Sequence, residues 1–330
     1  MITFFLIYIL FSFIIFFLSA KISYKLKLLD FPNNRKIHKE PTVYTGGITI
    51  SFILIFAVQL LDVLSPDLAL IISISFLISI VGVVDDKYHL NTGGKLSLQI
   101  IPIFYLIVFG NFFLSNIGNY NYFNLDLGTF ALPFTLLSVL FLTNAFNYFD
   151  GLDGTLSFSV ISVLCILFFL YPNQNFHLFL IILILPISIF LCFNFSLFKL
   201  PKIFLGDSGS LLLGFIVSFL LIYMANQRVV HPILLAWSVV IFVYEFLSVN
   251  LIRLKKNQSL FKAGQDHLHH ILFKKNKSIF ITNSLIFLIN SFLFCLGYIS
   301  FFVFNSFISF GLFIFLFTIF FLIREKVSKI

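Results

Sequence analysis

The sequence has few of the residues that a soluble protein needs on its surface. Only 10% of its 330 residues are charged, whereas 60% are hydrophobic, and the mean hydropathy is +1.08. A soluble domain typically carries about 25% charged residues, and the polar surface available here cannot cover a globule of this size. A soluble fold is therefore excluded, and the composition predicts an integral membrane protein.

Cysteine is also scarce, and no linker divides the chain. Cys165, Cys192 and Cys295 lie inside apolar runs without metal-ligand spacing, so we interpret them as small hydrophobic residues. The sequence has no stretch rich in proline, glycine and serine and no heptad repeat. We therefore expect residues 1–330 to form a single membrane domain.

What the chain has in abundance is long apolar runs. A membrane-spanning helix needs about 20 mostly apolar residues. Eleven runs approach this length, at 2–20, 44–64, 68–84, 96–115, 128–147, 156–171, 176–195, 208–225, 231–251, 279–301 and 305–323. Two of them are short, which also allows ten spans. The predicted fold class is all-α, a polytopic membrane protein of about eleven transmembrane helices.

The distribution of basic residues predicts the orientation. All but Arg228 of the 21 lysines and arginines fall on one side of an eleven-span protein, in the loops at 21–43, 85–95, 196–207 and 252–278 or after residue 323. Cytoplasmic loops carry such an excess of positive charge, so we expect an outside N-terminus and a cytoplasmic active face. This bias and anionic lipids explain the net charge of +8 without a nucleic acid partner. The first run lacks a preceding basic residue and a following cleavage site, which favours a first span over a removable signal peptide.

The few acidic residues of that face mark three places where an apolar run meets water. Asp85 and Asp86 end the third run in "VGVVDDKYHLNTGGKLSLQ", Asp150 and Asp153 end the fifth, and Asp207 opens the eighth in "FLGDSGS". Three carboxylate groups at one depth could together hold a hard divalent ion, and Mg²⁺ is the usual choice where phosphates are bound. Taken singly, each aspartate is more often a helix cap.

Four polar residues in "TNAFNYFDGLDG" make the cap interpretation weaker. Asn144, Asn147, Asp150 and Asp153 recur at intervals of three residues, and residues three apart on a helix lie within side-chain reach of one another. A cap needs only one polar residue, so the set of four favours a functional site at the membrane rim.

The basic loops offer partners for phosphate. Arg35 and Lys39 lie in the first loop, in "NNRKIHKEPTVYTGG", and His267, His269 and His270 lie in "HLHH" in the last large loop. Lysine and imidazole N–H groups donate hydrogen bonds to phosphate oxygens. Zinc binding by HLHH is a weaker alternative, because no cysteine and only a distant acidic residue would complete the site.

Five motifs on this face resemble those of one enzyme family. They are "PTVYTGG", "DDKYHLNTGGKLSLQ", "NAFNYFDGLDG", "FLGDSGS" and "HLHH", in this order. From about residue 30 to about residue 272, the chain resembles the polyprenyl-phosphate N-acetylhexosamine-1-phosphate transferases, which are glycosyltransferase family 4. Members of this family start the synthesis of peptidoglycan lipid, O-antigen and other cell-envelope polysaccharides.

The resemblance implies a reaction and its partners. Undecaprenyl (polyprenyl) phosphate would attack the β-phosphorus of a UDP-N-acetylhexosamine, giving a polyprenyl-diphosphate-sugar and UMP. The family implies a Mg²⁺ cofactor, which Mn²⁺ can replace, and a location in the bacterial inner (cytoplasmic) membrane. A second copy of the chain, in a homodimer, is a further candidate partner.

The resemblance also implies roles for individual residues. Asp207 would be the principal Mg²⁺ ligand, with Asp85 and Asp86 as further metal ligands near the attacking lipid phosphate. The matches assign the nucleotide-sugar site to Lys39, Asn144, Asn147, Asp150, Asp153 and Phe204, and the lipid-phosphate or diphosphate site to Arg35, Lys95, His267, His269 and His270. The catalytic candidates are Asp85, Asp86, Asp150, Asp153, His267, His269 and His270.

Two branches of the family remain as alternatives. "HLHH" and "PTVYTGG" favour the branch that transfers simple N-acetylhexosamine phosphates, such as GlcNAc-1-phosphate. The peptidoglycan branch, which transfers phospho-MurNAc-pentapeptide, has a run of three histidines instead. Gln265 and Glu245 stand where many members of the favoured branch have Arg and Asp, so the donor sugar stays open.

Two alternatives lie outside the family. A prenyltransferase would need paired Asp-rich motifs, which Asp85-Asp86 and "DGLD" imitate only loosely. A membrane transporter would hold its polar residues near the bilayer midplane, whereas here they gather at one face. Release of UMP from a UDP-sugar is expected for the family and for neither alternative.

Overall fold

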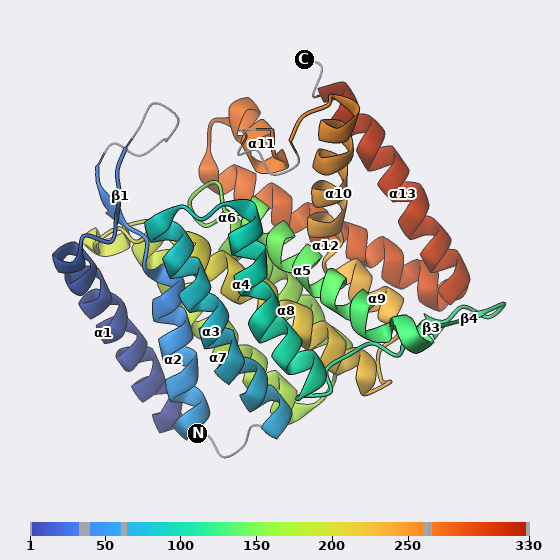
Figure 1. Ribbon diagram of the computed structural model, residues 1–330, viewed down its shortest axis with the longest axis horizontal. Coiled ribbons are helices and arrows are strands. Elements are labelled where there is room, and N and C mark those ends of the chain that lie inside the picture. Colours follow the sequence, from blue (N-terminus) through green and yellow to red (C-terminus); the bar gives the residue numbers. More distant parts are fainter. Residues whose placement is uncertain (1, 33–39, 61–64, 260–263, 265, 328–330) are drawn as a thin grey trace. The chain divides into compact units, whose positions relative to one another are not determined.

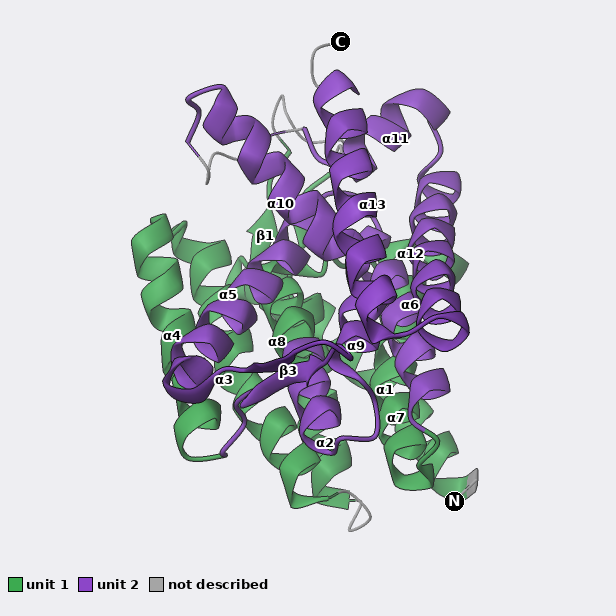
Figure 2. Cartoon of the chain, turned by 90° about the vertical axis from the view of Figure 1, so that its right-hand side faces the viewer, with its two compact units in different colours: residues 1–110, 172–216 green, residues 111–171, 217–330 purple. Residues whose placement is uncertain are grey.

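The computed structural model describes residues 2–32, 40–60, 65–259, 264 and 266–327. Nearly all of the regular structure within these ranges is helical (Figure 1), so the predicted all-α class is confirmed. The chain divides into two compact units, residues 1–110 with 172–216 and residues 111–171 with 217–330 (Figure 2). A single membrane domain over residues 1–330 remains a prediction.

Unit 1 is a helical bundle that contains three of the recognised motifs. Its helices are α1 (Ile2–Leu26), α2 (Gly46–Leu60), α3 (Pro66–Tyr88), α4 (Thr92–Val108), α7 (Gln174–Asn194) and the first part of α8 (Gly206–Asn226). Helix α2 packs against α1, α3 and α7, and α3 packs against α4. Strands β1 (Leu29–Asp30) and β2 (Thr42–Val43) pair antiparallel before α2, and the 3-10 turn η2 (Leu197–Lys199) follows α7.

Local sequence sets the helix ends around the first acidic motif. Pro66 opens α3, where its fixed φ suits the first turn, and Ser65 caps it by accepting a hydrogen bond from the Leu68 amide. His89 adopts a left-handed conformation with φ 50° and ends α3. The side chain of Asn91 then caps α4 by accepting from the Gly94 amide at 2.7 Å. The short turn 89–91 therefore brings the end of α3 close to the start of α4.

Two glycines allow the start of α8 to approach its neighbours closely. A Cβ atom at Gly47 of α2 would overlap the backbone of Gly209, and one at Gly82 of α3 would overlap the backbone of Ser208. Any larger side chain at either position would push α8 away. The "GDSGS" motif thus begins α8 at a point of backbone contact with α2 and α3.

Unit 2 contains the other two motifs. It is built from β3 (Asn116–Asn119), β4 (Asn124–Asp126), η1 (Gly128–Phe130), α5 (Ala131–Phe149), α6 (Thr155–Leu170), α9 (Pro232–Ser238), α10 (Val240–Lys255), α11 (Leu268–Asn276), α12 (Ile279–Val303) and α13 (Ser306–Val327). Strands β3 and β4 pair antiparallel. Helix α12 packs against α6, α9, α11 and α13, and α10 packs against α5 and α13.

A sharp bend of 73° separates α9 from α10. Such a break frees backbone groups that need partners in apolar surroundings. The fully buried Asn290 of α12 supplies them: its side chain donates to the Ser238 carbonyl oxygen at 3.1 Å and accepts from the Ile241 amide at 3.4 Å. The bend is therefore a stabilised feature of unit 2, and α10 leads from it toward the HLHH segment.

The helix lengths define a multi-pass membrane protein. Among the described residues, seven helices are long and apolar enough to cross a membrane, or eight if the bent pair α9 and α10 forms one span. Three shorter apolar helices, α2, α4 and α6, coincide with other predicted spans. The count of eleven spans and the orientation of the chain remain predictions.

Candidate functional site

Lys95 lies between two of the predicted carboxylates of unit 1. Its Nζ atom is 2.8 Å from Oδ2 of Asp85 and 2.5 Å from Oδ2 of Asp207. Asp85 comes from the last turn of α3, Lys95 from the first turn of α4 and Asp207 from the first turn of α8. Two carboxylates this close repel each other unless a cation neutralises them, and the ammonium group of Lys95 supplies that charge.

Asp86 has a different position from its neighbour Asp85. Its two carboxylate oxygens accept hydrogen bonds from the amides of Asp207 (3.1 Å) and Ser208 (3.4 Å) at the start of α8. Amides in the first turn of a helix lack helical partners and favour a negative charge. Gly206, with φ 73°, turns the chain there, and a Cβ on it would lie 2.7 Å from Oδ2 of Asp86. Asp86 therefore fixes the backbone that presents Asp207.

The first-loop motif and the Gly-Asp motif are joined by backbone hydrogen bonds. The Phe204 amide donates to the Val43 carbonyl (2.8 Å), and the amides of Gly46 and Gly47 donate to the carbonyls of Phe204 (2.9 Å) and Leu205 (2.8 Å). The half-buried Phe204 ring lies 5.3 Å from Nζ of Lys202. These hydrogen bonds hold together two motifs that are about 160 residues apart in sequence. A site shared by both motifs in unit 1 requires this proximity.

The carboxylates of unit 1 have the chemistry that Mg²⁺ prefers, since this ion often takes one or two carboxylates and completes its shell with phosphate oxygens and water. Within the described ranges, however, no three acidic, histidine or cysteine side chains are grouped for a metal ion. Lys95 stands between Asp85 and Asp207, and Asp86 faces the start of α8. The structure does not form the three-carboxylate cluster expected from the sequence. Asp207 and Asp85 would hold Mg²⁺ together with substrate oxygens.

The Asn/Asp motif of unit 2 is only partly helical. Helix α5 carries Asn144 and Asn147 and ends at Phe149, so Asp150 is its C-cap residue and Asp153 lies in the following turn. Asn144 donates to the carbonyl oxygen of Leu140, one turn earlier, at 2.8 Å. The expected helical spacing thus holds for the two asparagines but not for the two aspartates, because the chain leaves the helix between them.

Asn283 of α12 fixes the turn that contains Asp153. Its Nδ2 atom donates to the Asp153 carbonyl oxygen at 2.9 Å, and its Oδ1 atom accepts from the Thr155 hydroxyl at 2.6 Å. Asn283 and Thr155 are both almost completely buried. Sequence reasoning missed this role, although a polar residue inside an apolar run is the signal that pointed to the other motifs.

Two of the three histidines lie against this same turn, and the third, His267, lies against Tyr148 of α5. His267 immediately precedes α11, and His269 and His270 are in its first turn. The rings of His267 and His269 are parallel within 7°, with centroids 5.8 Å apart. A Cβ at Gly151 would overlap the ring of His269 and lie 3.0 Å from Nε2 of His270. Unit 2 therefore brings the HLHH motif and the Asn/Asp motif together.

Burial favours the neutral form of all three imidazoles. It lowers the pKa of His267 to about 4, although the Asp266 carboxylate acts in the opposite direction. It holds the pKa of the fully buried His269 well below the usual range, with the neighbouring His270 as the next cause. Burial and Lys274 lower the pKa of His270 as well. A neutral imidazole can donate one hydrogen bond and accept another, so these rings suit phosphate or sugar oxygens.

Three further charged residues surround the histidines. Arg253 binds the Asp266 carboxylate with two nitrogens, at 3.2 Å and 2.9 Å. Arg324 of α13 binds the buried Glu245 of α10. In the sequence, Glu245 stood out only as a departure from the family pattern, and neither arginine had a predicted role. A charge in or beside an apolar run costs free energy unless it is paired. The positions of Glu245 and Arg324 in and beside such runs are therefore the signal from which this ion pair could have been predicted.

The remaining predicted residues fall outside the described ranges. Arg35 and Lys39 lie in 33–39, and Gln265 is a single undescribed position. The roles expected for these residues stay predictions.

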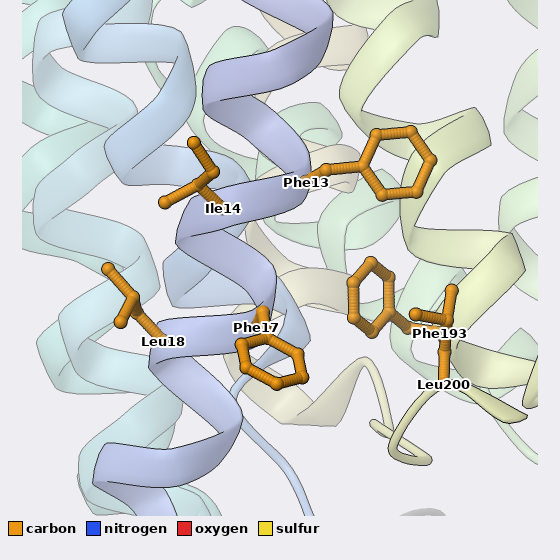
Figure 3. Close-up of a pocket in the computed structure, with 6 residues that line it drawn as sticks. All are labelled: Phe13, Ile14, Phe17, Leu18, Phe193 and Leu200. Atoms are coloured by element: carbon orange, nitrogen blue, oxygen red, sulfur yellow. The ribbon is translucent and has the colours of Figure 1, made fainter.

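An apolar groove lies on α1 and α7 in unit 1 (Figure 3). It is lined by Phe13, Ile14, Phe17, Leu18, Phe193 and Leu200. Because every lining residue is apolar, the groove suits a hydrocarbon chain and cannot orient a nucleotide-sugar, which needs polar contacts.

Comparison with known proteins places the chain in a family. The model of glycosyl transferase family 4 matches residues 68–225. The chain is 30% identical to the "probable undecaprenyl-phosphate N-acetylglucosaminyl 1-phosphate transferase" of Bacillus subtilis, over 76% of this chain and 71% of the relative. It is 27% and 28% identical to the "undecaprenyl-phosphate alpha-N-acetylglucosaminyl 1-phosphate transferase" of Escherichia coli K12 and of Yersinia pestis, over 80% and 82% of this chain and 74% and 76% of the relatives.

The fold and the polar clusters thus define a multi-pass membrane enzyme. The chain belongs to glycosyl transferase family 4 and is a transferase. The family resemblance inferred from the five motifs is confirmed, and the family favours an enzyme over a transporter.

Proposed function

We propose that this enzyme transfers N-acetylglucosamine-1-phosphate, or a related N-acetylhexosamine-1-phosphate, from a UDP-sugar to undecaprenyl phosphate. The main support is that the named relatives in three bacteria carry out this type of transfer according to their names. Their names favour the simple N-acetylhexosamine branch over the peptidoglycan branch. The product would start O-antigen or another cell-envelope polysaccharide.

The chemical step exchanges one phosphate linkage for another. An oxygen of the lipid phosphate attacks the β-phosphorus of the UDP-sugar and forms a new P–O bond. The bond from the β-phosphorus to the bridging oxygen breaks, and that oxygen leaves with its electron pair on UMP. The lipid phosphate is already largely ionised near pH 7, so its attack needs no general base.

The acidic cluster of unit 1 would serve the phosphate groups. A phosphate that approaches Asp85 and Asp207 meets two negative charges, so binding depends on positive charge at this place. Lys95, which lies between both carboxylates, can turn its ammonium hydrogens to the incoming phosphate oxygens. When bound by Asp207 and Asp85, Mg²⁺ would neutralise charge on the diphosphate. Asp86 would act indirectly, by holding the first turn of α8.

The polar residues of unit 2 would serve the nucleotide-sugar. Asn144, Asn147 and Asp150 offer amide and carboxylate groups at and near the end of α5, which suit ribose, uracil or sugar hydroxyl groups. His267 lies beside Tyr148 of α5 and His270 beside the turn that follows, and both would donate to phosphate oxygens. In phosphoryl transfer such positioning and charge neutralisation supply most of the rate enhancement.

The topology that we propose has eleven spans, an outside N-terminus and a cytoplasmic active face in the bacterial inner membrane. The charge distribution of the loops supports it.

A homodimer remains a prediction. The mass of the purified protein in detergent, measured by light scattering, would test it.

The deciding experiment is an assay with purified protein. Incubation with undecaprenyl phosphate and UDP-GlcNAc should release UMP and form a lipid-linked diphosphate sugar. A panel that adds UDP-GalNAc and 6-deoxy analogues would identify the donor. The same panel with the Gln265→Arg variant would show whether residue 265 affects the choice of sugar, since an arginine there could bind a phosphate group through two nitrogens. No UMP release with any donor in the panel would refute the proposed function.

A further inference from the structure

Glu245 is a completely buried carboxylate that contacts other residues of unit 2. It lies on α10, and its oxygens accept hydrogen bonds from Nε and Nη2 of Arg324, each at 2.8 Å. Oε1 also accepts from the amide of Leu268, the first residue of α11, at 2.8 Å. A two-point contact between arginine and carboxylate fixes both distance and orientation, so Glu245 ties the start of α11 to α13.

Arg324 also contacts the histidine segment directly. Its Nη2 atom donates to the backbone carbonyl oxygen of Asp266 at 2.6 Å. Arg324 is only 3% exposed although it lies in the last turn of α13. One side chain from the C-terminal helix thus holds the backbone on one side of His267 directly and on the other side through Glu245.

His267 is the nearby group that Glu245 could bind instead. Its Nδ1 atom lies 3.8 Å from Oε1 of Glu245, which is beyond hydrogen-bond distance. This nitrogen is buried and has no hydrogen-bond partner among the described residues. Since Arg324 already occupies both oxygens of the carboxylate, Glu245 does not draw a proton onto His267.

We propose that Arg324 is a positioning residue for the histidine segment: it fixes the backbone at Asp266 and Leu268 and keeps Glu245 from forming an ion pair with His267. The importance of this segment for sugar-phosphate transfer rests on the proposed function. The contacts themselves do not, because they join α10, α11 and α13 in the structure.

The charges around His267 agree with this assignment. It is faced by Glu245 and Arg253 of α10, Arg324 of α13, the ring of Tyr148 of α5, and Asp266, His269 and His270 of its own segment. Besides burial, Arg253, His270 and Arg324 lower its pKa, while Asp266 raises it. Removal of Arg324 would delete one cation and release the Glu245 carboxylate, and both changes raise the pKa of His267.

The first test is a titration that needs no substrate. In detergent-solubilised protein with ¹⁵N-labelled histidine, the His267 signal is assigned by comparison with His267→Gln. We expect Arg324→Met to move the pKa of His267 from about 4 to or above about 6.5, the ordinary value. The double variant Glu245→Gln/Arg324→Met should lower it again toward the native value, because the Glu245 carboxylate is gone while Asp266 stays paired with Arg253.

The second test is the pH profile of UMP release. In Arg324→Met the acid limb of the kcat profile should move to higher pH by the same amount as the pKa, and kcat should fall at least about tenfold because the segment is displaced. Arg324→Lys keeps a cation but loses the two-point contact. It should therefore keep the native acid limb and still lower kcat. Lys326→Met, an exposed change in the same turn of α13, is the matched control and should leave both quantities unchanged.

The outcomes separate the two proposals. Fluorescence of the buried Trp237, the only tryptophan in the sequence, reports whether each variant is folded. If Arg324→Met does not fold, the kcat of Arg324→Lys tests the inference. Unchanged His267 titration in folded Arg324→Met, or unchanged kcat in folded Arg324→Lys, would overturn the inference. Absence of UMP release from the native protein would refute the proposed function instead, and the titration would still decide the role of Arg324.

Discussion

Asn283 of α12 holds the backbone of Asp153, with 2.9 Å between its Nδ2 atom and the Asp153 carbonyl oxygen. This contact joins a motif at the end of α5 to a helix that lies beyond residues 68–225, the part that the family model matches. Arg324 of α13 holds the histidine segment in a similar way. Within unit 2, the last two helices therefore support the polar segments without carrying a recognised motif.

The contact of Asn283 should matter for both stability and turnover. Asn283→Leu removes the partner of the partly buried Asp153 carbonyl and of the buried Thr155 hydroxyl, and each unsatisfied group costs about 1–3 kcal/mol. We expect the free energy of unfolding to fall by about 2–6 kcal/mol for the two groups together and kcat to fall at least about tenfold, since the Asp153 turn loses its anchor. The measurements are unfolding in mixed detergent micelles and UMP release. Asn305→Leu, which removes a cap at the start of α13, should lower stability but not kcat. An equal loss of kcat in both variants would contradict a specific role of Asn283.

Lys95 should be essential for turnover. Lys95→Met leaves Asp85 and Asp207 without the ammonium group between them, so a phosphate would meet the two carboxylates with one cation fewer to neutralise them. We expect kcat/KM to fall at least about 100-fold, a typical cost of losing one group that stabilises the transition state. Lys95→Arg should recover part of the loss. Lys87→Met, which changes an exposed lysine in the last turn of α3, should have little effect. Near-native kcat/KM in Lys95→Met would exclude the proposed role.

Chelation should abolish transfer. If Asp207 and Asp85 hold Mg²⁺ with the substrate, excess EDTA should stop UMP release, and added Mg²⁺ or Mn²⁺ should restore it. Asp207→Asn should lower kcat by orders of magnitude and raise the Mg²⁺ concentration needed for half-maximal activity, with the thermal unfolding temperature retained. Full activity in excess chelator would rule out the metal requirement.

Acidification should destabilise unit 2 through its histidines. The folded protein holds the pKa of His267 at about 4, whereas an unfolded histidine titrates near 6.5. Between these values the unfolded state binds more protons, so the stability present above about pH 6.5 is lost as the pH falls toward 4. Each such histidine contributes roughly 1.4 kcal/mol per pH unit in this window. Unfolding followed by Trp237 fluorescence should show this slope, and His267→Gln should reduce it. A slope that is the same in both proteins would be inconsistent with a neutral buried His267.

Thiol labelling should reveal the topology. Single cysteines at Asn91, Lys202 and Gln258, in a protein whose three native cysteines are replaced, should react with an impermeant reagent only from the cytoplasmic side. A cysteine at Asn119, in β3, should react only from outside. Reaction of any of the four from the opposite side would break the eleven-span topology at that position.

The sequence by itself determined the class of protein and the motifs. Its hydropathy required a membrane, because too few charged residues exist to cover a soluble globule. The placement of Asp85, Asp150 and Asp207 at the ends of apolar runs marked them as functional candidates, because charge in such places is costly, and the histidines stood out as partners for phosphate in the last basic loop. These signals are local, so they can be read without knowledge of which helices are neighbours.

Only the tertiary structure decided which of these residues contact one another. The sequence grouped Asp85, Asp86 and Asp207 as equals, but Lys95 stands between two of them and Asp86 binds the amides of α8. Nor did the sequence pair Glu245 with Arg324, which are 79 positions apart. An ion pair depends on distance and burial in space, and these follow from the packing of helices that hydropathy alone shows to be apolar.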